Sequence, residues 1–268
     1  MTFAVRRQQS RAEPGDINDA FACTRRTMRR LPSLLTRSAW LALAGLFTLA
    51  GCSEEKPAEK PRTAESRKVP QTRAQVPVGK GFDFYVLSLS WSPSWCAEND
   101  AGGRTQQCRR GNENGFIVHG LWPQNDRGYP EFCRTRESDR VPETLGRTVL
   151  DIIPSMGLVG HQWRKHGSCS GLSQKDYFAV TRAARERVRI PEGLEPERNG
   201  TRLSPDEIEQ ALVSANPGLD RKGIAVTCAG GQLEEVRICM TPDLSFRPCP
   251  EVDRAACRAK SIEQPPIR

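Results

Sequence analysis

The pattern of apolar and polar positions along this chain predicts four β-strands. They are residues 82–91, 116–119, 223–228 and 232–240. The first, FDFYVLSLSW, is rich in β-branched and aromatic side chains with alternation in places, and predicts a core strand. Gly120 and Pro123 follow the second apolar run, so we expect that strand to end at His119.

Four helices are predicted between the second and the third of these strands. They are residues 143–153, 158–168, 173–190 and 204–215. The last opens with Ser-Pro-Asp-Glu at 204–207, a capping box with Pro at the first helical position. Strands and helices together predict an α+β domain.

The N-terminal part of the chain has the pattern of an export signal. Arg29, Arg30 and Arg37 form a basic region, followed by the apolar stretch Ala39–Ala50. That stretch is shorter than the roughly 20 residues of a membrane-spanning helix and typical of a signal-peptide core. We therefore expect residues 28–52 to be a signal peptide and residues 1–27, with Cys23, to be a mis-assigned start.

The signal ends in Leu49-Ala50-Gly51-Cys52, which resembles a bacterial lipobox. We expect Cys52 to carry lipid, and Ser53 after it favours attachment to the outer membrane on the periplasmic side. Ordinary cleavage nearby, giving a soluble periplasmic or secreted protein, is the alternative.

Composition then divides the remainder of the chain. Residues 53–80 are rich in Pro and charge and almost without large apolar side chains, which predicts a flexible tether. A single domain with its own core is expected over residues 81–258, followed by a short tail at 259–268.

Net charge says little about partners. The chain holds 40 basic and 32 acidic residues, a net charge of +8. Residues 1–52 contain eight Arg and three acidic residues, so residues 53–268 carry a net charge of only +3. The basic balance alone does not establish a nucleic-acid partner.

Cysteine usage favours disulfides over a metal site. Eight of the ten cysteines lie in the predicted domain: Cys96, Cys108, Cys133, Cys169, Cys228, Cys239, Cys249 and Cys257. An even number behind an export signal predicts disulfides. No Cys-x-x-Cys pair occurs, so no metal ion or other cofactor is expected. Eight cysteines allow 105 pairings, among which spacing does not choose.

All three histidines lie in two short segments. His119 lies in FIVHGLWPQ at 116–124, and His161 and His166 lie in HQWRKHGSC at 161–169. On a helix over 158–168, His161, Gln162, Lys165 and His166 share an arc of about 140°, away from Trp163 and Arg164. Histidine exchanges protons near neutral pH, so this set suits acid–base chemistry at a phosphodiester.

The two segments, in this order, resemble the two active-site signatures of the ribonuclease T2 family. The resemblance implies an antiparallel sheet with packed helices, an endoribonuclease activity on single-stranded RNA and a protein that we expect to be a monomer. It implies His119 and His166 as the acid–base pair, with His166 accepting and His119 donating a proton in the first step. Lys165 would stabilise phosphoryl charge and His161 would bind phosphate.

Three further residues are candidates for binding a base. Trp122 follows His119 as in the family, and base stacking and core packing are equally expected for it. For Tyr129, packing in the core or in a loop is the stronger expectation. Gln124 stands where some relatives carry Asp. Trp91 and Trp95 are expected in the core.

Position 162 departs from many members of the family, which have Glu there. The amide of Gln162 can donate a hydrogen bond to a phosphoryl oxygen but carries no charge. We expect the change to be tolerated.

The resemblance also suggests how the cysteines pair. It suggests Cys133–Cys169, the nested pairs Cys228–Cys257 and Cys239–Cys249, and by remainder Cys96–Cys108.

Two other functions stay open. A non-catalytic RNA-binding or inhibitor-type lipoprotein on the same fold is made possible by Gln162. A metal hydrolase would use the three histidines, but His161 and His166 lack the i, i+4 spacing of a zinc helix, with no Glu between them.

Overall fold

The computed structural model describes residues 76–194 and 199–267. These residues all belong to the second of two compact units, residues 68–268. The expected start region, signal peptide, Cys52 and most of the tether lie outside the described residues and stay predictions. Within the described ranges, no helix has the length and apolarity to cross a membrane.

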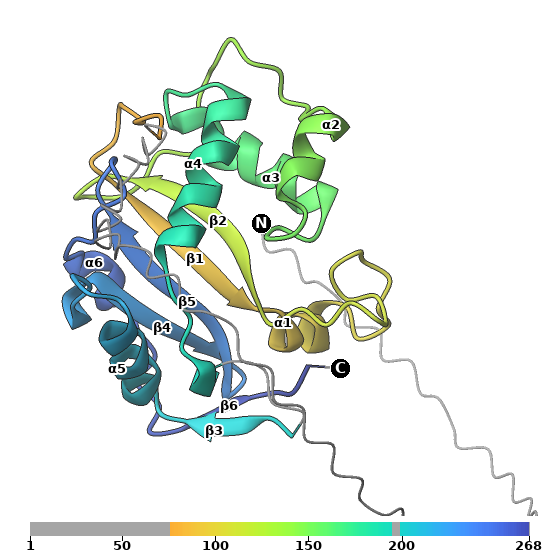
Figure 1. Ribbon diagram of the computed structural model, residues 1–268, viewed down its shortest axis with the longest axis vertical. Coiled ribbons are helices and arrows are strands. Elements are labelled where there is room, and N and C mark those ends of the chain that lie inside the picture. Colours follow the sequence, from red (N-terminus) through yellow and green to blue (C-terminus); the bar gives the residue numbers. More distant parts are fainter. Residues whose placement is uncertain (1–75, 195–198, 268) are drawn as a thin grey trace, which may run out of the picture. The chain divides into compact units, whose positions relative to one another are not determined.

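One sheet of six strands organises the domain (Figure 1). The strands are β1 (Phe84–Trp91), β2 (Phe116–Gln124), β3 (Thr201–Leu203), β4 (Ile224–Ala229), β5 (Gln232–Met240) and β6 (Ile262–Gln264). Their order is β2-β1-β5-β6-β3, with β4 also paired to β5. All pairings are antiparallel except the single contact of β5 with β6. The expected antiparallel sheet with packed helices is confirmed.

Helices connect and cover the strands. They are α1 (Ser92–Asn99), α2 (Glu143–Gly146), α3 (Met156–Lys165), α4 (Gln174–Arg187), α5 (Pro205–Ala215) and α6 (Pro250–Asp253), with 3-10 turns at Arg147–Val149, Gly167–Cys169, Glu192–Leu194 and Arg221–Gly223. The capping box at Ser204 and Glu207 is present, as predicted. The helix expected over 143–153 is shorter than predicted. Helix α2 ends at Gly146, and a 3-10 turn follows it and ends at Val149. The helix expected over 158–168 is α3, which begins earlier, at Met156, because Ser155 caps its first turn. It also ends earlier, at Lys165, because the chain passes at His166 into a 3-10 turn.

The two faces of β1 have different roles. Tyr85, Leu87, Leu89 and Trp91 alternate with Phe84, Val86, Ser88 and Ser90, and all eight are buried. The first set belongs to the main core, which includes Trp163 of α3 and Tyr177 and Phe178 of α4. The second face carries small polar side chains, Ser88 and Ser90, beneath the candidate site. The predicted core strand is confirmed.

Strand β2 corrects the expectation that a strand ends at His119. It continues through Gly120 and Pro123 to Gln124. Proline is tolerated because β2 is an edge strand paired only with β1. Val118 pairs with Leu89 and Gly120 with Ser88, so His119 is the extra residue of a β-bulge. Bulges redirect side chains beside active sites.

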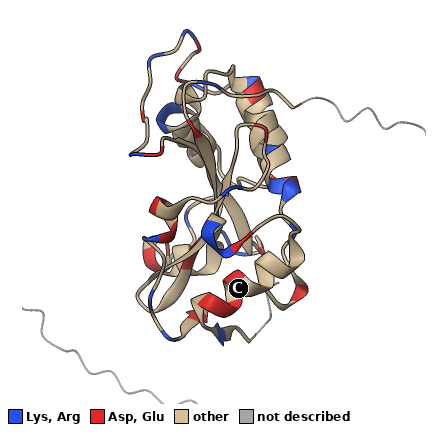
Figure 2. Ribbon diagram, turned by 90° about the vertical axis from the view of Figure 1, so that its left-hand side faces the viewer, with Lys and Arg blue, Asp and Glu red and all other residues tan. Residues whose placement is uncertain are grey.

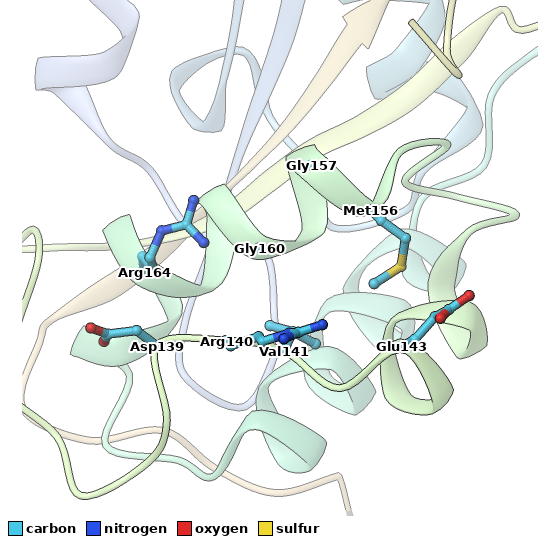
Figure 3. A pocket seen from close by; sticks show the side chains of 8 residues that line it. All are labelled: Asp139, Arg140, Val141, Glu143, Met156, Gly157, Gly160 and Arg164. Atoms are coloured by element: carbon cyan, nitrogen blue, oxygen red, sulfur yellow. The ribbon is translucent and has the colours of Figure 1, made fainter.

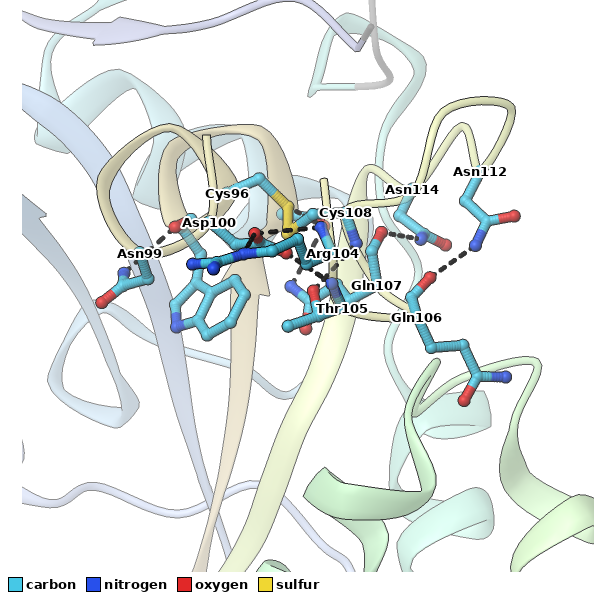
Figure 4. The surroundings of a disulfide bond; sticks show 12 residues. Cys96, Asn99, Asp100, Arg104, Thr105, Gln106, Gln107, Cys108, Asn112 and Asn114 are labelled. Carbon is cyan, nitrogen blue, oxygen red and sulfur yellow. Dashed lines mark hydrogen bonds and ion pairs between the residues drawn. A yellow bond between two sulfur atoms is a disulfide. The ribbon is translucent and has the colours of Figure 1, made fainter. Parts of the chain in front are cut away.

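The structure contains the four disulfides that the resemblance implied. They are Cys96–Cys108, Cys133–Cys169, Cys228–Cys257 and Cys239–Cys249. The first closes the loop after α1, where the Asp100 carboxylate accepts the backbone N–H groups of Arg104 and Thr105 (Figure 4). Cys133–Cys169 ties the loop after β2 to the 3-10 turn that follows α3.

The segment expected as a tail is part of the fold. Strand β6 lies in the sheet with Ile262 and Gln264 buried, and the Trp91 indole N–H donates to the Pro265 carbonyl at 3.0 Å. The domain boundary expected at residue 258 is therefore wrong. A short, polar segment gives little strand signal, and β6 is held by its pairing in the sheet.

Candidate active site

All eight residues predicted for catalysis, phosphate binding or base binding line one cavity of about 280 Å³. Its lining is Val86, His119, Trp122, Gln124, Tyr129, His161, Gln162, Lys165, His166, Arg237 and Val252. The groups come from β1, β2, β5, the loop after β2, and α3 with its C-terminal end. The two sequence segments therefore converge in space.

Helix α3 divides its polar residues between surface and interior. His161 is exposed and Lys165 half-buried, while Gln162 is buried. His166 caps the C-terminus, and a 3-10 turn follows. The four polar groups share one side of the helix as predicted, but their burial differs strongly.

His119 is held by a buried carboxylate. Its Nδ1 hydrogen-bonds the Oε1 of Glu235 on β5. Arg237 donates a hydrogen bond from its Nε to the other oxygen of Glu235, Oε2, at 2.8 Å. A terminal nitrogen of the same guanidinium, Nη2, lies 2.7 Å from that oxygen. Burial alone would raise the pKa of Glu235, but the hydrogen bond and charge of His119, together with Arg237, lower that pKa to about 2. The carboxylate is therefore ionised at neutral pH.

His166 has a contrasting environment. Its side chain is buried, its ring stacks on Trp122 with centroids 5.2 Å apart, and its Nδ1 has no hydrogen-bond partner in the protein. Burial first, then the charges of Lys165, His119 and His161, lower the pKa of His166 to about 3. This histidine is neutral at pH 7.

Gln162 positions Trp122. Its Oε1 accepts the Trp122 indole N–H at 3.0 Å, and its buried Nε2 has no partner. Gly120 permits this contact, because a Cβ there would lie 2.0 Å from the Gln162 Oε1 and 2.3 Å from the Trp122 Nε1. A buried donor without a partner is uncommon, which makes the Nε2 group a candidate for binding a ligand oxygen.

Lys165 and His161 lie side by side on the cavity lining, and Lys165 supplies the positive charge of the two. The Lys165 ammonium lies 3.7 Å from Glu131, and both side chains are partly exposed, so this ion pair is weak. Partial burial, then Lys165, lowers the pKa of His161. The Phe132 N–H donates to the Lys165 carbonyl at 2.9 Å, and Cys133–Cys169 fastens the same loop. The end of α3 is thereby fixed against the loop after β2.

The base-binding candidates differ in availability. The Trp122 ring contacts His119 and His166, and the Arg237 guanidinium lies over it at 5.4 Å. The expected packing of Tyr129 in the core or in a loop is wrong, because its side chain is exposed on the loop after β2 and offers an open ring. Gln124 lies at the cavity wall with its amide donating to the Pro123 carbonyl.

The sequence pattern did not predict Glu235 and Arg237 as site residues, and it predicted the wrong surroundings for Trp95. Glu235 and Arg237 share one face of β5, and their i, i+2 spacing within an apolar strand is the signal that could have found them. Trp91 is in the core as expected, but Trp95 is half-buried and lines two hollows that also touch His119.

A larger hollow lies on the other side of α3, with about 500 Å³ of space (Figure 3). It is lined by Asp139, Arg140, Val141, Glu143, Met156, Gly157, Gly160 and Arg164. None of the predicted site residues lines it. Across residues 76–194 and 199–267, no group of three or more His, Cys, Asp or Glu side chains could hold a metal ion.

The neutral His166 predicts a specific dependence of stability on pH. Its pKa is about 3 when folded and near 6.5 when unfolded, so acidification between these values protonates only the unfolded chain and lowers the free energy of unfolding. Between pH 7 and pH 4.5 we expect His166→Asn to lose about 2 kcal/mol less than the wild type. Urea unfolding of both proteins at the two pH values measures this, and parallel losses would contradict it.

Comparison with known proteins agrees with this geometry. A model of the ribonuclease T2 family matches residues 82–249. A ribonuclease of Aeromonas hydrophila is 44% identical over 110 residues, covering 41% of this chain and 48% of that protein. A probable ribonuclease of Haemophilus influenzae is 32% identical over 149 residues, covering 51% and 52%. The chain thus spans about half the length of these two relatives.

Solved structures share the fold. RNase NT in complex with 5′-AMP matches with a TM-score of 0.58 at 24% identity, covering 70% of this chain and all of that one. An RNase-related protein from Calystegia sepium matches with a TM-score of 0.57 at 23% identity and the same coverage. At sequence identities below 25%, these matches establish a likeness of fold alone.

Proposed function

Because the chain belongs to the ribonuclease T2 family, we propose that it is a metal-independent endoribonuclease that cleaves single-stranded RNA through 2′,3′-cyclic phosphates. One observation supports this most. Two histidines of opposite electrostatic character, His119 paired with a carboxylate and His166 buried and neutral, line the same cavity. A proton acceptor and a proton donor are what transphosphorylation requires.

In the first step the 2′-hydroxyl of the substrate attacks the adjacent phosphorus. Neutral His166 accepts the hydroxyl proton, and His119, in its charged form beside Glu235, donates a proton to the departing 5′-oxygen. The 2′-oxygen–phosphorus bond forms as the 5′-oxygen–phosphorus bond breaks, leaving a cyclic phosphate. Hydrolysis of that ring reverses the two roles.

Anionic substrate improves His166 as a base. A phosphodiester beside the imidazole favours its protonated form, which opposes the burial and the cationic neighbours that lower its pKa in the free protein. A bound phosphate therefore raises the pKa of His166 and makes it a better proton acceptor.

The remaining groups act on the phosphate. Lys165 supplies positive charge to the five-coordinate phosphorane, and exposed His161 binds phosphate at the entrance. The unpartnered Nε2 of Gln162 donates to a phosphoryl oxygen, a role that does not need the charge of Glu. In the view of Figure 2, Lys and Arg are interspersed with Asp and Glu along the ribbon.

Digestion of RNA by the purified protein in EDTA tests this proposal. We expect cleavage of single-stranded RNA with 5′ fragments ending in 2′,3′-cyclic phosphate by mass spectrometry, and no cleavage of DNA of the same sequence. An RNA with a single 2′-deoxynucleotide should resist cutting only at the bond after that sugar. Cutting there at the normal rate would contradict the mechanism. Cleavage that occurs without EDTA and is lost in its presence would support a metal hydrolase, and RNA that stays intact both with and without EDTA would support a binding protein.

A further inference from the structure

The His119–Glu235 contact crosses a strand of the sheet. His119 is on β2 and Glu235 on β5, and β1 lies between them. On the face that they share, β1 presents the small side chains of Ser88 and Ser90, which pair with Arg237 and Glu235 respectively. The β-bulge at His119 and these two serines together leave room for the imidazole to reach over β1.

Glu235 is itself fixed on both oxygens. Its side chain is only 5% exposed, one oxygen bonds His119 and the other bonds Arg237. Arg237 is held in turn by its position over the Trp122 ring. A buried carboxylate in such a clamp has little freedom to move, so it defines where the imidazole points.

The charges around His119 come from several elements. From α3 and its end, His161, Lys165 and His166 line the cavity, and from β5 so does Arg237. Glu98 of α1 and Glu234 of β5 line a neighbouring hollow together with His119 and Glu235. Glu235 is the buried carboxylate in direct contact with the imidazole, and position 162 contributes no charge.

We propose that Glu235 is a positioning residue for His119 in the proposed ribonuclease reaction. By accepting a hydrogen bond from Nδ1–H, it directs Nε2 into the cavity and stabilises the imidazolium that must donate the proton. Arg237 keeps the carboxylate in place. The inference rests on the proposed function.

The test is Glu235→Gln, which keeps the shape and an acceptor oxygen but removes the charge. We expect kcat to fall about 10–100-fold, as when carboxylate partners of metal-bound histidines are changed, with KM little altered. The alkaline limb of the kcat–pH profile should move to lower pH, because the donor loses its proton more readily without the carboxylate. The acidic limb, which reports the acceptor, should stay in place.

Glu234→Gln is the matched control. It removes the same charge from the next residue of β5, whose exposed side chain accepts from the Thr227 hydroxyl. We expect its profile to equal that of the wild type. If Glu235→Gln leaves both kcat and the alkaline limb unchanged, or if Glu234→Gln moves them equally, the positioning role is refuted. If the wild type does not cut RNA, the proposed function fails instead.

A measurement on the wild-type protein covers the case in which the variant does not fold. Nitrogen-detected NMR of the histidine rings should show the neutral form of His119 with its proton on Nδ1. A neutral form protonated on Nε2 would overturn the inference without any activity measurement.

Discussion

Replacing His119 or His166 by Ala is expected to reduce the rate of RNA cleavage by about 10²–10⁴-fold in each case, the range typical of general acid–base catalysis. Each variant removes one end of the proton path, so the double variant should lose little more than either single one. Initial rates on a defined single-stranded RNA, with kcat and KM separated, measure this.

His161→Ala is the comparison within the same cavity. It removes an exposed imidazole proposed to bind phosphate, so we expect KM to rise with kcat largely kept. Either acid–base variant with a rate within a few-fold of the wild type would show that the reaction uses another group.

Loss of the Cys133–Cys169 disulfide is the second large effect that we expect. Its 36-residue separation predicts a loss of roughly 4 kcal/mol in the chain-entropy treatment when both cysteines are changed to Ala. Cleavage should also fall, because the bond fastens the loop after β2 to the end of α3, where Lys165 and His166 lie. Urea unfolding and RNA cleavage, at a temperature where the variant is folded, measure the two effects.

The Cys228–Cys257 pair is a control of similar loop length. Its separation is 29 residues, so changing both cysteines to Ala should cost a similar free energy of unfolding. Neither cysteine lines the cavity, so activity of the folded variant should be kept. Equal loss of activity in both variants would show that the effect is one of stability alone.

The site was predictable because its chemistry is concentrated in two short segments. His119, Lys165 and His166 were found from the clustering of the histidines and from the resemblance of the two segments to the family signatures, and the structure brings them into one cavity. Glu235 was missed, because an acidic residue on a strand is usually a solvated one and its i, i+2 spacing with Arg237 was the only local signal. Its role depends on the neighbours that the strand order supplies.

The predicted limits of strands were wrong where pairing within the sheet overrides the local sequence signals that usually end a strand. Gly120 and Pro123 ordinarily end a strand, but β2 is an edge strand whose ladder runs along β1, and Gly120 makes room for the contact of Gln162 with Trp122. Likewise, β6 has almost no local signal and is held by its partners β3 and β5. Both failures concern where a segment lies in the sheet, which a local window of sequence does not contain.

The position of β5 has a consequence for how the protein is made. This strand lies at the centre of the sheet, between β1 and β6, yet it follows the segments of all three histidines along the chain. A nascent chain that already contains all three histidines and the β1–β2 pair still lacks the second strand that pairs with β1 and the carboxylate that holds His119. On the proposed function, we expect the capacity to cut RNA to be acquired only after β5 has been synthesised. The order of elements along the chain thus separates synthesis of the histidines from completion of the site that uses them.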